Sequence, residues 1–336
     1  MLASAKNLRD RSKMMSDPLG QIVTLTGARC GISGKLVAGA PWALHYPPPR
    51  QIKFMGVVAG ACWLIVDANE APRRVGEGDV LMLSGGSYTL ASEPGVAPRD
   101  ALEVFTDLSL KVVKVGTGND FVAIGGHVTL DPEHGWMLAD VLPALIHIDS
   151  GSSEASAVRF FLDQLVAEVG SGRPGASLMS EQLAQLLFVQ TLRSYLPIAG
   201  SLAQGWIRVL ADERIAPALH LMHREPGRPW QLEELAKSVA MSRTNFAVRF
   251  KAAAGVGPVT YLSNWRMRIA QQRLRDTSVP VATLALSLGY TSESAFSNAF
   301  KRSVGMSPAR YRSTHREIDP LSRGNPAAPS VPLTVV

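Results

Sequence analysis

The last third of the chain contains two copies of one segment, separated by fifty positions. Seven residues of the first copy recur unchanged in the second: Ser242/Ser292, Phe246/Phe296, Phe250/Phe300, Lys251/Lys301, Gly255/Gly305, Pro258/Pro308 and Tyr261/Tyr311. Just upstream the offset is 49, since Leu235-Ala236 is matched by Leu284-Ala285. Unrelated segments rarely keep one spacing across so many chemically distinct side chains, so we infer an internal duplication.

Each copy has the pattern of two short helices joined by a tight turn. In the first copy, residues 231–239 place their apolar side chains on one helical face, and residues 240–241 follow as the turn. Ser242 is a suitable N-cap for the next helix. Phe246 and Phe250 lie four positions apart, which puts both on one side of that helix, where we expect them to be buried. The pattern predicts a helix-turn-helix at about 231–254.

A longer helix is expected between the two copies. Gly255 fits the left-handed residue that ends a helix, and Pro258 fits the first position of the next one. The predicted connecting helix covers 258–276, and the second helix-turn-helix covers about 281–304. Double-stranded DNA is therefore the leading candidate partner.

The charge distribution favours the same partner. Residues 201–316 contain 17 Lys and Arg against 7 Asp and Glu, a net charge of +10 within a chain whose total is +6. The remaining residues therefore carry −4. A basic segment attached to a slightly acidic one is typical of a nucleic-acid-binding module joined to another domain.

Residues 20–150 have the pattern of a β-rich domain, with short apolar runs separated by Gly, Pro and Gly-Asp turns. The run from Val57 to Pro94 resembles the cupin jelly roll that serves as a sensor domain in bacterial regulators. The resemblance depends on a small set of positions: Gly60, Trp63, Leu64, Gly78-Asp79 and Leu83 through Gly86. It implies a β-barrel or jelly roll in which Gly78-Asp79 forms a hairpin turn.

Metal-binding cupins use a His-x-His pair with a Glu and a later His, and this chain has no His-x-His. Tyr88 stands where related sensor domains often have a histidine. The front-half histidines are scattered through the sequence: His45, His127, His134 and His147. We therefore expect no metal, no cofactor and no catalytic residue.

The pattern becomes helical after residue 150. Apolar residues at helical spacing from Val158 to Val169 and from Leu178 to Leu196 predict a helical hairpin within 151–200. A hairpin this apolar packs either on its own barrel or on a second copy of the chain. The equivalent helices dimerise in the regulators that the chain resembles, which favours a homodimer.

Residues from about Trp206 to Arg312 resemble the DNA-binding domain of the AraC/XylS family, most specifically in GYTSESAFSNAFKRSVGMSPARYR near the end. The resemblance implies that one chain presents two recognition helices to successive major-groove segments of promoter or operator DNA. It assigns eight residues to base-facing positions: Arg243, Thr244, Ala247, Val248, Glu293, Ser294, Ser297 and Asn298. It assigns three residues to the DNA backbone: Lys251, Lys301 and Arg302.

We therefore expect an α+β multidomain regulator, with residues 1–19 flexible, 20–150 a sensor, 151–200 a hairpin, 201–316 a DNA-binding domain and 317–336 a disordered tail. A small-molecule effector and RNA polymerase are candidate partners. The effector cannot be identified from the sequence. Two cysteines and the lack of a signal-like or membrane-spanning apolar run favour the cytoplasm. The alternatives are a metal-free cupin enzyme and an architectural DNA binder.

Overall fold

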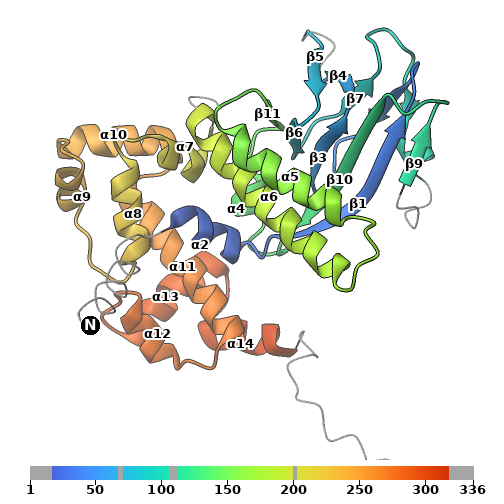
Figure 1. Cartoon of the computed structure of the whole chain (residues 1–336). Coiled ribbons are helices and arrows are strands. Elements are labelled where there is room, and N and C mark those ends of the chain that lie inside the picture. The colour runs from blue at the N-terminus through green and yellow to red at the C-terminus, as the bar shows by residue number, and fades with distance from the viewer. Residues whose placement is uncertain (1–16, 67–70, 106–111, 200–202, 318–336) are drawn as a thin grey trace, which may run out of the picture.

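The computed structural model describes residues 17–66, 71–105, 112–199 and 203–317. Figure 1 shows a β-rich domain, a pair of long helices lying against it, and a purely helical region on the other side. This arrangement confirms the predicted fold class, a jelly-roll-like domain followed by a helical hairpin and an all-α domain. The predicted tail at 318–336 and residues 1–16 lie outside the described residues.

The β-rich domain is built from two sheets. The larger sheet has the strand order β11 (Leu145–Ile148), β6 (Val80–Leu83), β3 (Ile52–Ala59), β10 (Phe121–Thr129), β1 (Arg29–Ala38) and β9 (Val112–Val115). The smaller sheet has the order β5 (Arg73–Gly76), β4 (Ala61–Ile65), β7 (Tyr88–Ala91), β2 (Ala43–Tyr46) and β8 (Arg99–Asp100). Neighbouring strands are antiparallel except for the pairs β1–β9 and β2–β8. Gly78, at φ +83°, forms a turn before β6 as predicted, but the turn is not that of a hairpin, because it leads from β5 in the smaller sheet to β6 in the larger one.

The larger sheet is buried on both faces, and the alternation of side chains along β3 shows how. Val57 packs into the apolar core between the two sheets, together with the partly buried Met55. Ile52 and Phe54 point the other way, into a second core shared with helices. Because successive residues of a strand face opposite sides, one strand serves both cores.

The second core is covered by the predicted helical hairpin, α5 (Ala155–Glu168) and α6 (Ala176–Ala199). Leu162 of α5 lies so close to β3 that a Cβ atom on Gly56 would be 2.3 Å from its Cδ1. The hairpin therefore packs directly on its own β domain. Helix α6 contains Pro197 and continues through it to Ala199.

A short helix precedes the first strand and was missed in the sequence. Helix α2 (Pro18–Leu25) is capped by Asp17, whose carboxylate accepts a hydrogen bond from the Gly20 amide at 2.9 Å. Residues 18 and 19, predicted as part of a flexible segment, therefore belong to this helix. Both side chains are buried, and Leu19 packs into the second core. The β domain also contains two one-turn helices, α3 (Ala101–Val104) and α4 (Trp136–Ala139).

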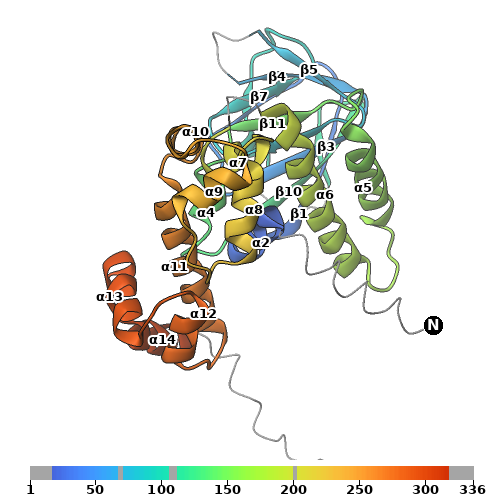
Figure 2. The ribbon, with the colours of Figure 1, turned by 90° about the vertical axis from the view of Figure 1, so that its left-hand side faces the viewer.

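The helical region contains eight helices among the described residues. They are α7 (Gly205–Ala211), α8 (Ala216–Arg224), α9 (Leu232–Ser238), α10 (Arg243–Ala254), α11 (Pro258–Asp276), α12 (Val281–Ser287), α13 (Glu293–Val304) and α14 (Pro308–Glu317). They form two small apolar cores, one around α10 and one around α13. In Figures 1 and 2, α10 lies near the top of this region and α13 near its lower end, with α11 connecting the two units.

Candidate nucleic-acid interface

The first helix-turn-helix consists of α9 and α10. Ala240 adopts a left-handed φ of +52° and reverses the chain between the two helices. The Ser242 hydroxyl accepts a hydrogen bond from the Asn245 amide at 3.3 Å, so the predicted N-cap is confirmed. Gly255, at φ +77°, ends α10 in the left-handed conformation that glycine adopts without strain.

The second unit, α12 and α13, repeats these local features. Ser292 caps α13 by accepting a hydrogen bond from the Ala295 amide at 3.1 Å, and Gly305 ends it at φ +85°. Helices α9 and α12 both have seven residues, and α10 and α13 both have twelve. The change of offset from 50 to 49 therefore falls in the turn, where Gly289 takes the left-handed position at φ +81°.

The paired phenylalanines anchor each second helix to its core, as predicted. Phe246, Phe250, Phe296 and Phe300 are all fully buried. The ring centroids are 5.7 Å apart within each pair. Because this stripe fixes the inward face of α10 and of α13, the opposite face of each helix is turned outward.

The two units also contact each other directly, through backbone at two glycines. A Cβ atom on Gly227 would lie 2.3 Å from the carbonyl oxygen of Ser287, the last residue of α12, and a Cβ atom on Gly289 would lie 2.2 Å from the carbonyl oxygen of Gly227. Arg266 of α11 donates hydrogen bonds to the carbonyl oxygens of Pro226 and Arg228 at 2.6 and 2.8 Å. This backbone contact and the arginine hold the two units at a fixed separation.

The outward face of α10 combines apolar and basic side chains. Arg243, Thr244 and Lys251 are exposed, and Ala247 is partly exposed. Val248 has 64% of its surface exposed. The five residues of α10 that were predicted to face DNA therefore lie on one surface of the helix.

The outward face of α13 is polar. Glu293, Ser294, Asn298, Lys301 and Arg302 are exposed, and Ser297 is partly exposed. Three of them, Asn298, Lys301 and Arg302, line a shallow hollow on the surface together with Ala295. Among the described residues, these three side chains have no hydrogen-bond or ion-pair partner, so they are available to a ligand.

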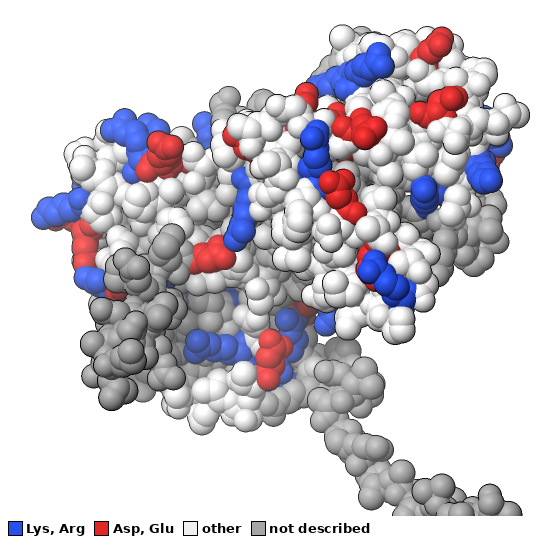
Figure 3. All heavy atoms as spheres, viewed as in Figure 1, with Lys and Arg blue, Asp and Glu red and all other residues white. Residues whose placement is uncertain are grey.

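Several other cations of the helical region are occupied within the protein. Arg249 pairs with Asp212 at 2.7 Å, and Lys237 pairs with Glu233 at the same distance. Figure 3 shows one face of the molecule, on which acidic and basic side chains are interspersed over the β domain and the hairpin. Lys301 and Arg302 of α13 therefore differ from these paired cations.

The four scattered histidines of the β domain do not converge. His147 hydrogen-bonds the Asp79 carboxylate at 2.9 Å, and His45 and His127 contact the hydroxyls of Thr89 and Ser33. Burial alone would raise the pKa of Asp79, but hydrogen bonds from His147 and from backbone amides lower it to about 2. Across the part of the chain that the structure describes, no group of three or more His, Cys, Asp or Glu side chains could hold a metal ion.

The fold and these exposed faces together define a class of protein: a transcription regulator with a β-rich N-terminal domain and a bipartite DNA-binding domain. Residues 17–197 match a family described as Cupin, and residues 235–314 match one described as a helix-turn-helix domain.

An AraC-like transcription regulator from Streptomyces antibioticus is 39% identical over 88% of this chain and 98% of its own length. The regulator AlkR from Acinetobacter baylyi is 29% identical over 70% of this chain and 79% of its own length. The crystal structure of the DNA-binding domain of AdpA with a target DNA is 29% identical, covers 33% of this chain and 99% of its own, and has a TM-score of 0.32. The chain belongs to the AraC/XylS family of transcription regulators and carries a cupin N-terminal domain. No helix in the described ranges is long and apolar enough to cross a membrane.

Proposed function

We propose that this regulator binds promoter or operator DNA as a homodimer in the cytoplasm, and that its cupin domain transmits the state of a small-molecule effector to the two recognition helices. The exposed, unpaired side chains of α13 are the observation that carries the DNA-reading part of the proposal. The regulator acts by changing its DNA affinity or its contact with RNA polymerase and catalyses no reaction.

We propose that the two helices read DNA by different chemistry. Asn298 of α13 has the amide needed for a bidentate pair with adenine, and Glu293 can accept a hydrogen bond from a cytosine amino group. Ser294 and Ser297 add short hydrogen-bonding groups to the same helix. On α10, Thr244, Ala247 and the exposed Val248 instead offer methyl groups that fit the methyl group of thymine.

The remaining cations are assigned to the phosphate backbone. Lys251 and Lys301 occupy equivalent positions in the two copies, each in the last turn of its helix. Arg302 lies beside Lys301, and Arg243 lies in the first turn of α10, where it also serves a base-facing position. Phosphate contacts set the position of a helix in the groove, whereas base contacts select the sequence.

The helical hairpin supports the proposed dimer. Its outer surface exposes large apolar side chains: Phe160 on α5 and Leu178, Met179 and Leu186 on α6, with exposed fractions between 48% and 62%. Exposed apolar groups that gather on neighbouring helices mark interaction surfaces. Light scattering of the full chain tests this assignment, and a monomer at micromolar concentration would exclude it.

An effector must bind two states of the cupin domain with unequal affinity, because only that difference shifts the equilibrium between them. The space between the sheets is filled by side chains, including Tyr46 and Tyr88, whose rings stack at 4.7 Å. An effector that binds there has to displace them. The shift of the unfolding midpoint in the presence of candidate ligands measures such binding.

The central test is selection of bound oligonucleotides from a random pool by the full chain, followed by footprinting on the selected duplex. We expect two short elements about one helical turn apart, because each chain presents two recognition helices. Enrichment of no sequence would contradict the proposed reading by α10 and α13.

Replacing Asn298 with alanine should relax the base preference at one position of the element read by α13. The expected loss of discrimination is about 1–3 kcal/mol, the typical value of a bidentate pair between a side chain and a base. Competition binding with duplexes that carry each substitution measures it. Asn119, exposed in the cupin domain between β9 and β10, provides an asparagine control, and unchanged discrimination at every position in Asn298→Ala would remove Asn298 from the reading surface.

Replacing Lys301 with alanine should weaken binding to all sequences alike. Loss of one phosphate contact flattens the dependence of log affinity on log salt concentration by about one unit. Titrations of one duplex at several salt concentrations give this slope. The equivalent Lys251→Ala should behave in the same way, whereas Lys237→Ala, which removes a cation already paired with Glu233, should leave the slope unchanged.

A further inference from the structure

The internal duplication includes a tyrosine that closes each unit, Tyr261 in the first copy and Tyr311 in the second. Each ring packs edge-on against the second phenylalanine of its own recognition helix. The centroid distance is 5.7 Å for Tyr261 and Phe250 and 5.5 Å for Tyr311 and Phe300, at interplanar angles of 72° and 75°. Both tyrosines therefore lie directly behind a recognition helix, on the side opposite to its outward face.

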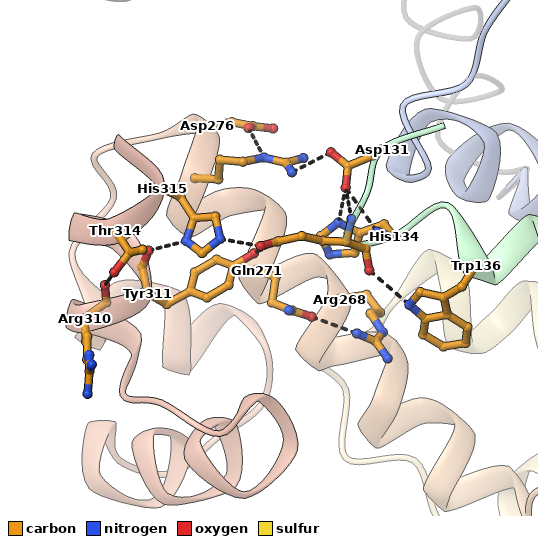
Figure 4. Close-up of polar contacts among 12 residues, drawn as sticks. Asp131, His134, Trp136, Arg268, Gln271, Asp276, Arg310, Tyr311, Thr314 and His315 are labelled. Carbon is orange, nitrogen blue, oxygen red and sulfur yellow. Dashed lines mark hydrogen bonds and ion pairs between the residues drawn. The ribbon is translucent and has the colours of Figure 1, made fainter. Parts of the chain in front are cut away.

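In the second copy, the tyrosine hydroxyl is bound by the cupin domain. The hydroxyl of Tyr311 donates a hydrogen bond to the carboxylate of Glu133, in the segment between β10 and α4. The same carboxylate contacts the Nε2 atom of His315, whose ring stacks on Tyr311 at 4.0 Å. Figure 4 shows these side chains converging from α14 and from the cupin domain.

Two further contacts flank this junction. The carboxylate of Asp131 pairs with Arg275 of α11 at 2.7 Å, and the Arg268 guanidinium lies 4.5 Å from the centre of the Trp136 ring. Burial by itself raises the pKa of Glu133, but hydrogen bonds from Tyr311 and His315 outweigh it and hold that pKa below its ordinary value. The segment of residues 131–136 thus contacts the second unit mainly through charged side chains.

In the first copy, the equivalent hydroxyl is also linked to the cupin domain, through one intermediate residue. Tyr261 hydrogen-bonds Nε2 of the buried His223 at 2.8 Å, and Nδ1 of His223 hydrogen-bonds the side-chain oxygen of Gln21 at 3.0 Å. Gln21 belongs to α2, the helix that packs into the same apolar core as the hairpin. This link has no charged partner.

The two links meet inside the cupin domain. The amide of Asp131 donates a hydrogen bond to the carbonyl oxygen of Thr26, the residue that follows α2, at 2.8 Å. One small part of the cupin domain, formed by α2 and the segment 131–136, is therefore linked to both tyrosines, directly to Tyr311 and through His223 to Tyr261. Any movement of this part acts on both units together.

We propose that Tyr261 and Tyr311 are the positioning residues through which the cupin domain acts on the two recognition helices. The path runs from Gln21 through His223 and Tyr261 to Phe250, and from Glu133 through Tyr311 to Phe300. The outward faces of α10 and α13 remain exposed while both links are formed. The cupin domain therefore holds the helices from behind and regulates their position and rigidity without covering the DNA-binding surface.

The test uses substitutions that remove one end of a link while the rings stay in place. Tyr311→Phe and Glu133→Ala should each weaken binding to the element read by α13 about fivefold or more, the usual size of a coupling between sites. Tyr261→Phe and Gln21→Ala should do the same for the element read by α10. Each variant of the full chain is titrated with the selected duplex and with duplexes in which one element is scrambled.

The sensor-side variants distinguish coupling from a purely structural role. Glu133 and Gln21 lie outside the DNA-binding domain, and the two separate links, through Tyr311 with its neighbour His315 and through His223 with Tyr261, make each of them affect one element and not the other. The double variant Glu133→Ala with Tyr311→Phe should be no weaker than the stronger single variant, because both changes break the same link. Additive losses, or equal losses at both elements, would overturn the proposal.

Because this inference rests on the proposed DNA reading, a second measurement keeps the two separable. Hydrogen exchange of the free protein should become faster in α13 for Glu133→Ala and in α10 for Gln21→Ala. Unchanged exchange in both helices overturns the inference even if the wild-type chain binds the selected duplex. Faster hydrogen exchange in the variants, combined with no DNA sequence selected by the wild-type chain, would support the two links and contradict the DNA reading.

Discussion

Replacing Phe300 with alanine is expected to destabilise the second helix-turn-helix by about 3–5 kcal/mol, the usual loss for a large aromatic side chain deleted from a core. Phe300 is fully buried between Phe296 and Tyr311, and its core is small. A loss of this size is comparable to the whole stability of a small domain. The element read by α13 should therefore disappear from the footprint.

The duplication provides the matched experiment. Phe250→Ala makes the same deletion in the other copy and should remove the element read by α10 while the element read by α13 persists. Leu286→Ala, at a position in α12 that is 65% exposed, should change stability by less than about 0.5 kcal/mol. Footprints and denaturant titrations of the three variants measure both effects. If Phe300→Ala and Phe250→Ala erased the same element, the assignment of one element to each copy would be wrong.

The helix-turn-helix units could be predicted because their determinants are local. An N-cap serine, a phenylalanine pair at a spacing of four and a terminal glycine fix the start, the buried face and the end of α10 within fourteen residues. The same three signals recur fifty positions later for α13. A pattern that appears twice with one spacing limits the fold far more than either copy does alone.

The contacts between the domains could not be predicted for the opposite reason. Glu133 and Tyr311 are separated by 178 positions, and His223 and Gln21 by 202. Glu133, His223 and Gln21 have no motif around them, and the duplication that marks Tyr311 says nothing about its partner. His223 connects α2 with α11 from a buried position.

The cupin domain could be predicted from the sequence only in part. Its strands were recognisable as apolar runs separated by glycine turns, and Gly78 forms the expected turn before β6. Tyr88, found where related sensors often have histidine, stacks on Tyr46 within the core between the sheets. Aromatic packing therefore occupies the place in which a metal ligand might have been sought. Which side chains an effector displaces depends on packing between distant strands and leaves no local mark in the sequence.

Acidification is expected to destabilise the chain through His223. Burial, with a smaller contribution from His220, lowers the pKa of His223 from its ordinary 6.5 to about 3 in the folded protein. Between these two values the unfolded chain binds a proton that the folded chain does not, so stability falls as the pH falls through this window. The stability that depends on a neutral His223 is fully present above about pH 6.5. Moving from pH 7 to pH 5 should lower the free energy of unfolding by about 2 kcal/mol.

His223→Gln isolates this effect, because glutamine keeps a donor and an acceptor between Gln21 and Tyr261 but does not titrate. The variant should be less stable than the wild type at pH 7, since it loses the stacking of the imidazole on Trp265 at 4.1 Å. Its further loss between pH 7 and pH 5 should nevertheless be smaller by about 2 kcal/mol. Denaturant titrations at the two pH values, followed by tryptophan fluorescence, measure both quantities. Parallel pH profiles for the two proteins would show that His223 accepts its proton in the folded chain as readily as in the unfolded one, and that its link between α2 and Tyr261 is open to water.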